Sequence, residues 1–187
     1  MSLACCYHGS PITGIHTLAP PPGGPLYLTN NRAYALFYIR DMEINWVSCG
    51  VREGVVVYDE QFPGQLRALY AGRGGWLYAC ENDGFKPGSS PWIVLADRAV
   101  PVAAAAFIPD AYEAILREIK AGTVRVDSCE SKTPRRRQEF NAHMAQSILE
   151  ERWLGANTPR ARFVERYFPE AWEMARQLST GHMGGVP

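Results

Sequence analysis

The order in which strand-like and helical patterns follow one another constrains the fold of this chain more than any other feature. Up to Val126, short runs rich in β-branched and aromatic residues recur, with helical stretches between some of them. From Thr133 onward, the patterned stretches begin at a proline and carry apolar residues at helical spacing. Strands first and helices last predict an α+β protein with mostly antiparallel pairing, and not a doubly wound parallel sheet.

The same change in pattern predicts the domain organisation. With 187 residues and 47% hydrophobic content, the chain can bury a sizeable core. We predict one domain over residues 1–130 and a helical C-terminal extension over residues 131–178 that packs on it. Residues 179–187 contain three glycines and end in a proline, so we expect a disordered tail there.

Charge and cysteine content argue against several classes of protein. The 19 basic and 19 acidic residues cancel, so no global field attracts nucleic acid or anionic lipid. The five cysteines show no metal-ligand spacing, which argues for reduced thiols and against a metal site. Because neither a signal-peptide pattern nor an apolar stretch of membrane length is found, we expect a cytoplasmic protein without a membrane partner.

A proline- and glycine-rich segment over residues 19–25 separates two strongly patterned pieces and must form a loop. Before it, Leu3 to Tyr7 favours a short buried strand that ends at His8-Gly9-Ser10-Pro11. After it, Leu26-Tyr27-Leu28-Thr29 favours a second strand. The chain therefore predicts two strands that present their polar residues near the same loop.

A helix follows the second strand, with Asn30 or Asn31 as its N-cap. It carries Tyr38, eleven residues after Tyr27, and also Tyr34 one helical turn earlier. We expect one of these two tyrosines on the helix to be a core residue and the other to be available for a ligand.

These pieces resemble a motif of the ADP-ribosyltransferase superfamily, specifically of its diphtheria-toxin-like branch, which includes the poly-ADP-ribose polymerases. In that branch a first strand reading Tyr-His-Gly-Ser is followed by a strand reading Tyr-x-Thr and by a helix with a second tyrosine. The resemblance covers roughly residues 1–40 well and the later strands only loosely. It implies a split, mostly antiparallel β-sheet of the ADP-ribosyltransferase kind, and NAD as the substrate.

The resemblance also implies a role for each matching residue. His8 would hydrogen-bond a ribose of NAD, and the backbone of Gly9 would approach the carboxamide closely because glycine has no Cβ. Tyr27 and Tyr38 would sandwich the nicotinamide ring, whose positive charge favours an aromatic face. The implied NAD-binding residues are His8, Gly9, Ser10, Tyr27, Thr29 and Tyr38. We predict His8, Tyr38 and Glu81 as the catalytic residues, of which Glu81 is our choice of carboxylate and does not match a position of the motif.

The chain departs from the family pattern at the carboxylate. The family places a glutamate at the start of a later strand, where it stabilises an oxocarbenium-like transition state. The strand that corresponds best, Trp92 to Leu95, is preceded by Ser89-Ser90-Pro91 and has no carboxylate there. We take Glu81, at the end of the predicted strand Trp76 to Cys80, as the first alternative and Glu130 as the second.

Most of these residues also have a purely structural interpretation. Taken alone, His8 is interpreted as a surface or core histidine, and Glu81 as a solvated turn residue. Cys5 and Cys6 read as packing residues in a strand. The cluster Arg135-Arg136-Arg137 reads as a solvated helix start, although its unfavourable position on the helix dipole also suggests an anionic target such as an RNA backbone or a pyrophosphate.

The predicted function is that of an ADP-ribosyltransferase-like enzyme, which binds NAD, releases nicotinamide and passes ADP-ribose to an acceptor. The acceptor is unidentified: a protein, a nucleic acid or water. The alternative is a catalytically inactive module that binds ADP-ribose, NAD or an RNA end and lacks the glutamate. A third hypothesis is a structural or interaction protein in which Tyr-His-Gly-Ser is incidental.

Overall fold

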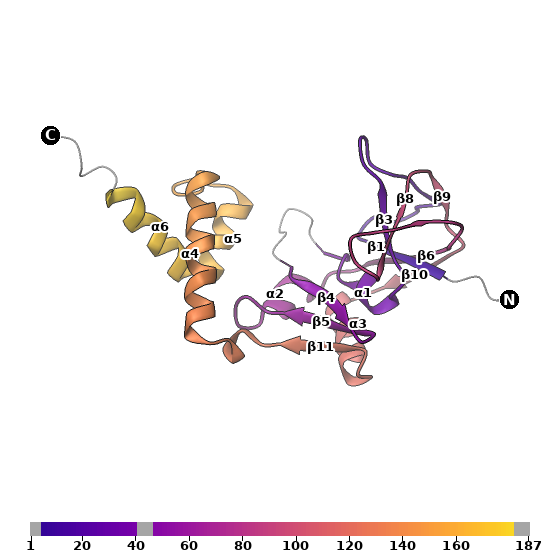
Figure 1. Ribbon diagram of the computed structural model, residues 1–187, viewed down its shortest axis with the longest axis horizontal. Coiled ribbons are helices and arrows are strands. Elements are labelled where there is room, and N and C mark those ends of the chain that lie inside the picture. The colour runs from indigo at the N-terminus through magenta and orange to yellow at the C-terminus, as the bar shows by residue number, and fades with distance from the viewer. Residues whose placement is uncertain (1–4, 41–46, 182–187) are drawn as a thin grey trace. The chain divides into compact units, whose positions relative to one another are not determined.

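The computed structural model describes residues 5–40 and 47–181, and this part of the chain is a mixed α+β structure with six α-helices and largely antiparallel sheets (Figure 1). It divides into two compact units. The first contains residues 5–40, Val47–Glu60 and Gly64–Asp127, and the second contains Gln61–Pro63 and residues 128–181. The predicted α+β class is confirmed.

The largest sheet of the first unit has six strands in the order β10-β6-β1-β3-β8-β7, and every neighbouring pair is antiparallel. The centre of this sheet is formed by the strands that were predicted around the proline-rich loop. The six strands are β1 (Cys5–Ser10), β3 (Leu26–Thr29), β6 (Gly75–Glu81), β7 (Lys86–Pro87), β8 (Ile93–Ala96) and β10 (Ala104–Ile108).

Two smaller sheets complete the first unit. β2 (Thr17–Leu18) pairs with β9 (Val100–Pro101). The other sheet has the order β11-β5-β4, in which β5 and β11 are parallel. Its strands are β4 (Cys49–Arg52), β5 (Val55–Asp59) and β11 (Val124–Asp127).

The valine-rich stretch from Ile44 to Val57, interrupted by Gly50 and Gly54, predicts a hairpin, and the pair β4 and β5 confirms it. Its connection consists of Glu53 and Gly54, which have positive φ angles of 52° and 80°. Two central residues with positive φ match the right-handed twist of the strands that they join. Residues 44–46, where the hairpin was expected to begin, lie outside the described residues.

The three helices of the first unit are α1 (Arg32–Leu36), α2 (Gln65–Tyr70) and α3 (Ala111–Lys120). Asn31 caps α1 by accepting a hydrogen bond from the N–H of Tyr34 at 3.0 Å, as predicted. The α1 helix is shorter than expected, because residues 37–39 continue it with tighter bonds, such as Tyr38 N–H to Ala35 C=O. The sequence predicts a helix with Pro109 in its first turn. This detail was wrong: Asp110 caps α3, so Pro109 precedes the helix.

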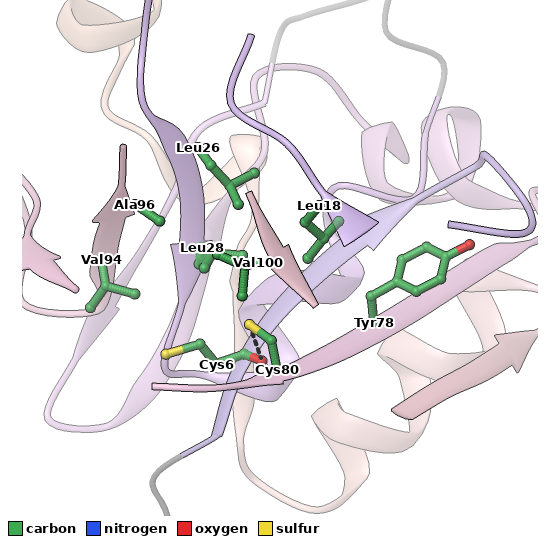
Figure 2. Close-up of a cluster of buried hydrophobic side chains, with 9 residues drawn as sticks. All are labelled: Cys6, Leu18, Leu26, Leu28, Tyr78, Cys80, Val94, Ala96 and Val100. Carbon is green, nitrogen blue, oxygen red and sulfur yellow. Dashed lines mark hydrogen bonds between the residues drawn. The ribbon is translucent and has the colours of Figure 1, made fainter. Parts of the chain in front are cut away.

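The hydrophobic core of the large sheet lies on one of its faces (Figure 2). Cys6, Leu28 and Cys80 extend into this core from three adjacent strands, and the thiol of Cys80 donates to the carbonyl of Cys6 at 3.6 Å. Side chains alternate between the faces of a strand, so the exposed Cys5 points away from this core. The packing role of Cys6 was predicted correctly, whereas Cys5 is exposed.

The opposite face of β1 lies directly against helix α1. A Cβ on Gly9 would overlap the carbonyl oxygen of Ala35, so only glycine permits this approach. Gly75 of the adjacent strand is similarly enclosed, since its Cβ would lie 2.7 Å from the carbonyl oxygen of Ser10. Gly9 lets the backbones of strand and helix come into contact, and Gly75 leaves room for the side chain of Ile39.

The second unit contains a single 3₁₀ turn, η1 (Cys129–Ser131), and three α-helices: α4 (Pro134–Glu150), α5 (Pro159–Tyr167) and α6 (Pro169–Gly181). Thr133 and Thr158 cap α4 and α5, each followed by a proline in the first turn, as the Thr-Pro pairs predicted.

Both ends predicted for this helical region were wrong in detail. The sequence predicts that the helix starting at Thr133-Pro134 stops at Gly155. α4 instead ends at Glu150, because the backbone turns at Arg152 with a positive φ of 55°. Residues 179–181 belong to α6 and not to a disordered tail, and residues 182–187 lie outside the described part. No helix in the described ranges has both the length and the apolar character needed to cross a membrane.

The close contact at Gly9 leads to a stability prediction. We expect Gly9→Ala to lower the free energy of unfolding by roughly 1–3 kcal/mol, because the new methyl group must displace the backbone of α1. The control is Gly24→Ala, where the nearest atom would be the ring of Pro21 at 3.8 Å. Urea unfolding compares the two variants. Equal stability of Gly9→Ala and Gly24→Ala would contradict the described packing.

Candidate functional site

The structure brings His8 and Tyr38 together where the large sheet opens. β1 and β3 are paired at Tyr7 and Thr29, but no further pair joins these two strands in the described residues, although β1 stays paired with β6 as far as Ser10. His8 lies at this opening, and its ring lies 6.4 Å from that of Tyr38 at an interplanar angle of 22°. Tyr38 comes from the turn that extends α1, which places it over the same end of β1.

The imidazole of His8 is oriented by a backbone hydrogen bond across the opening. Its Nδ1 lies 3.3 Å from the carbonyl oxygen of Tyr27. A carbonyl only accepts, so the neutral ring carries its proton on Nδ1 and keeps Nε2 as an acceptor. Burial lowers the pKa of His8, against a smaller raising effect of this hydrogen bond, and the ring is therefore neutral at pH 7.

A row of aromatic rings supports Tyr38 from behind. Its ring meets that of Tyr34 edge-on at 5.7 Å, and Tyr34 in turn lies 6.2 Å from the ring of Trp92. Tyr34 is buried, whereas Tyr38 is half-buried, so Tyr34 is the core member of the pair and Tyr38 the more accessible one. Edge-to-face packing of this kind holds a ring in one orientation.

Burial keeps four titratable groups of this site uncharged: the phenols of Tyr34 and Tyr38, the thiol of Cys49 and the imidazole of His8. Desolvation raises the pKa of Tyr34 and of Tyr38, and it raises the pKa of the Cys49 thiol in β4 to about 11. At neutral pH the two tyrosines, the thiol and His8 are thus all neutral. This group offers hydrogen-bonding and aromatic surface without a carboxylate.

Tyr27 presents an exposed ring, 55% accessible, on the side of the sheet that carries α1. Its neighbours Leu26 and Leu28 enter the core on the other face, which fixes the direction of Tyr27 by alternation. In the described part of the chain its ring contacts neither Tyr38 nor any other aromatic ring. The ring is accessible for contact with another molecule.

The hydroxyls of Ser10 and Thr29 form hydrogen bonds with the backbone of this site. The hydroxyl of Ser10 accepts from the N–H of Ile12 at 3.1 Å. The hydroxyl of Thr29 donates to the carbonyl of Trp92 at 2.8 Å and accepts from the N–H of Asn31 at 3.1 Å. Thr29 therefore joins the end of β3 to the start of both β8 and α1, and it positions the elements that carry the rings.

Neither carboxylate named from the sequence is brought to His8 by a described contact. Glu81 is the last residue of β6 and lies opposite Cys5, whereas His8 lies opposite Tyr78. This offset of three positions corresponds to about 10 Å along the strand. Glu81 instead lines a surface cavity of about 290 Å³ together with Asp83 and Arg98, which form an ion pair at 2.7 Å. Glu130 belongs to the second unit, where its carboxylate accepts from the hydroxyl of Ser128.

Trp92 directly precedes β8 and follows Ser89-Ser90-Pro91, the residues among which the family pattern calls for a carboxylate. Its carbonyl holds Thr29 and the N–H of Asn30, so its backbone is fixed. Its indole Nε1 is buried and makes no hydrogen bond within the described residues. The sequence showed that no glutamate precedes Trp92, but it did not predict that the indole of Trp92 would pack against the ring of Tyr34.

The second unit has a cavity of its own, of about 270 Å³, which the sequence analysis did not predict. Phe62 and Tyr167 stack in its wall at 4.5 Å, and Arg137 lies on its rim. Of the predicted basic cluster, Arg135 instead pairs with Glu139 at 2.8 Å. No local pattern could predict this cavity, because its walls come from Gln61–Pro63 and from helices far along the chain.

The lowered pKa of His8 leads to a pH prediction. As pH falls below about 6.5, the unfolded chain binds a proton at this histidine before the folded protein does, so folding stability decreases. We expect His8→Gln to lose part of the decrease in unfolding free energy between pH 7 and pH 5. Urea unfolding at each pH measures this decrease in the unfolding free energy. The control is His143→Gln, a substitution at an exposed position of α4. An unchanged pH dependence in His8→Gln would contradict the buried, neutral imidazole.

No protein family, curated protein or solved structure matches this chain in comparisons of its sequence and fold. In addition, no group of histidine, cysteine and acidic side chains in the described ranges is arranged to hold a metal ion. The site is therefore interpreted from its own geometry and from the motif described above.

Proposed function

We propose that this protein is an ADP-ribosyltransferase-like protein that binds NAD in its first unit, releases nicotinamide and transfers ADP-ribose to a macromolecular acceptor. The observation that carries the proposal is the contact between His8 and Tyr38 at the opening between β1 and β3. Two residues 30 positions apart, which the motif pairs, are neighbours in the structure. The exposed ring of Tyr27 lies on the strand at the other side of this opening.

In this proposal the nicotinamide ring of NAD lies between the rings of Tyr27 and Tyr38. The positively charged pyridinium is attracted by the faces of the two phenols. The Nε2 of His8 accepts a hydrogen bond from a ribose hydroxyl, since Nδ1 is already bonded to the carbonyl of Tyr27. The neutral imidazole of His8 adds no second cation beside the pyridinium. Arg40 is a cation near Tyr38: burial raises the pKa of this phenol, and Arg40 has a smaller lowering effect on it.

Transfer requires the glycosidic C–N bond to break, with its electron pair leaving on neutral nicotinamide. The acceptor then forms a bond to the ribose carbon and loses its proton. The positive charge that develops on the sugar is best stabilised by a carboxylate, and Glu81 is the residue proposed for this role. Because the ribose carbon that becomes charged is bonded directly to the nicotinamide, Glu81 can take this role only if its carboxylate reaches the ring site across the offset of about 10 Å along β6.

A second candidate function is binding of NAD or ADP-ribose without transfer. Two observations favour it: the lack of a carboxylate just before Trp92, and the displacement of Glu81 from His8. In this case the aromatic site recognises the ligand and no bond is broken. The two candidates share the same NAD site and differ in turnover.

Calorimetric titration with NAD⁺ tests the shared site. We expect Tyr38→Ala to weaken binding by about tenfold, because the loss of one stacked ring next to a cation costs about 1–2 kcal/mol. Tyr112→Ala, a half-buried tyrosine of α3, is the matched control and should bind as the unmodified protein does. Equal affinity of the two variants would contradict the proposed ring site, and absence of any binding would contradict both candidate functions.

Release of nicotinamide from labelled NAD⁺ separates the two candidates. If Glu81 serves transfer, Glu81→Gln should reduce turnover by about a hundredfold or more while leaving the affinity for NAD⁺ within about twofold. His8→Ala should reduce both turnover and affinity. Binding without turnover in the unmodified protein would reject transfer in favour of the binding module.

A further inference from the structure

Strand β10 forms an outer edge of the large sheet, and its side chains are accessible on both faces. It is the terminal strand in the order β10-β6-β1, and no strand in the described residues pairs with its outer side. Ala104, Ala105, Ala106 and Phe107 are all exposed, and Phe107 is 56% accessible. Along an antiparallel edge strand, every second residue directs its backbone N–H and C=O outward, so β10 has unmatched hydrogen-bonding groups.

The composition of β10 is unusual for an edge that remains in water. The segment from Val100 to Pro109 contains no charged residue, and the four residues 103–106 are all alanine. Edge strands that avoid further pairing usually carry lysine, a bulge or an inward-pointing charge. Phe107 in addition packs at 5.2 Å against Trp76 of β6, which extends the exposed apolar surface onto the sheet. These features are those of a strand that pairs with another strand.

We propose that β10 pairs with β10 of a second copy of this chain, antiparallel and across a twofold axis near Ala106. The pairing would join the two six-stranded sheets into one continuous sheet. In this register Phe107 of each copy lies opposite Ala105 of the other, so a large ring meets a small side chain. Pro101 and Pro109, which flank the segment, lack the N–H needed to extend the ladder and thus limit its length.

A second copy fits this edge better than an extended peptide of another protein. Recognition of a peptide strand draws its specificity from pockets for alternate side chains, and a row of alanines offers no such pockets. In a twofold pair the residue on the axis faces its own counterpart and the residues next to it lie close to theirs, which disfavours charged residues at such an edge because like charges repel. The absence of charge in β10 meets this requirement.

The contact area of such a pair is small. Two strands of five residues with the adjacent aromatic side chains bury less than the 1,200 Å² or so of a stable protein interface. The dimer should therefore depend on protein concentration, and sedimentation velocity over a range of concentrations should show exchange between monomer and dimer.

The test is a charge pair at the twofold axis. We expect Ala106→Lys and Ala106→Glu, each alone, to weaken self-association by about tenfold or more, because like charges then face each other. An equimolar mixture of the two variants should restore the dimer, since opposite charges meet. Ala142→Lys, at an exposed position of α4, introduces the same charge elsewhere and should leave association unchanged.

The mixture keeps the test decisive if a variant is merely destabilised, because a misfolded chain does not regain association from a partner of opposite charge. Circular dichroism of each variant checks its folding. A monomer at all concentrations, or a dimer that is indifferent to both substitutions, would overturn the proposal. Association of Ala106→Lys with Ala106→Glu no stronger than that of either alone would also overturn it.

Discussion

The contact between Gly9 and the carbonyl oxygen of Ala35 is the constraint on which the candidate site depends. Without a Cβ at Gly9, the backbone of α1 lies directly on β1, and the tight turns after α1 carry Tyr38 to the imidazole of His8. Tyr34 fixes Tyr38 from behind, and the hydroxyl of Thr29 fixes the start of α1. The parts of the motif, which are separated in the sequence, thus depend on one glycine for their geometry.

Local patterns predicted much of this arrangement. Asn31, Thr133 and Thr158 were recognisable as caps because each needs only its own side chain and the next turn. The strand β10 was not predicted, because a row of alanines has little β-propensity and the ladder with β6 alone determines its conformation. The end of α4 was missed for a similar reason, since Arg152 supplies the positive φ that glycine usually provides.

The site could be predicted only in part, because its chemistry depends on register. The pairing of His8 with Tyr38 follows from a short segment of chain, and the sequence contained both residues at suitable spacing. The position of Glu81 depends on how β6 pairs with β1. A carboxylate opposite His8 would be its neighbour, whereas Glu81, three residues further along β6, is remote from it. No spacing in the sequence conveys such a shift.

The alternation of side chains along β1 has a practical consequence for its two adjacent thiols. Cys5 is exposed, whereas Cys6 is buried against the core, and Cys80 and Cys129 are also buried. The Cys49 thiol stays protonated near neutral pH, which makes it a poor nucleophile. A maleimide dye should therefore attach selectively at Cys5, at the opposite end of β1 from His8, without any engineered cysteine. The native chain thus provides a single attachment point for fluorescence on the strand that bears the imidazole.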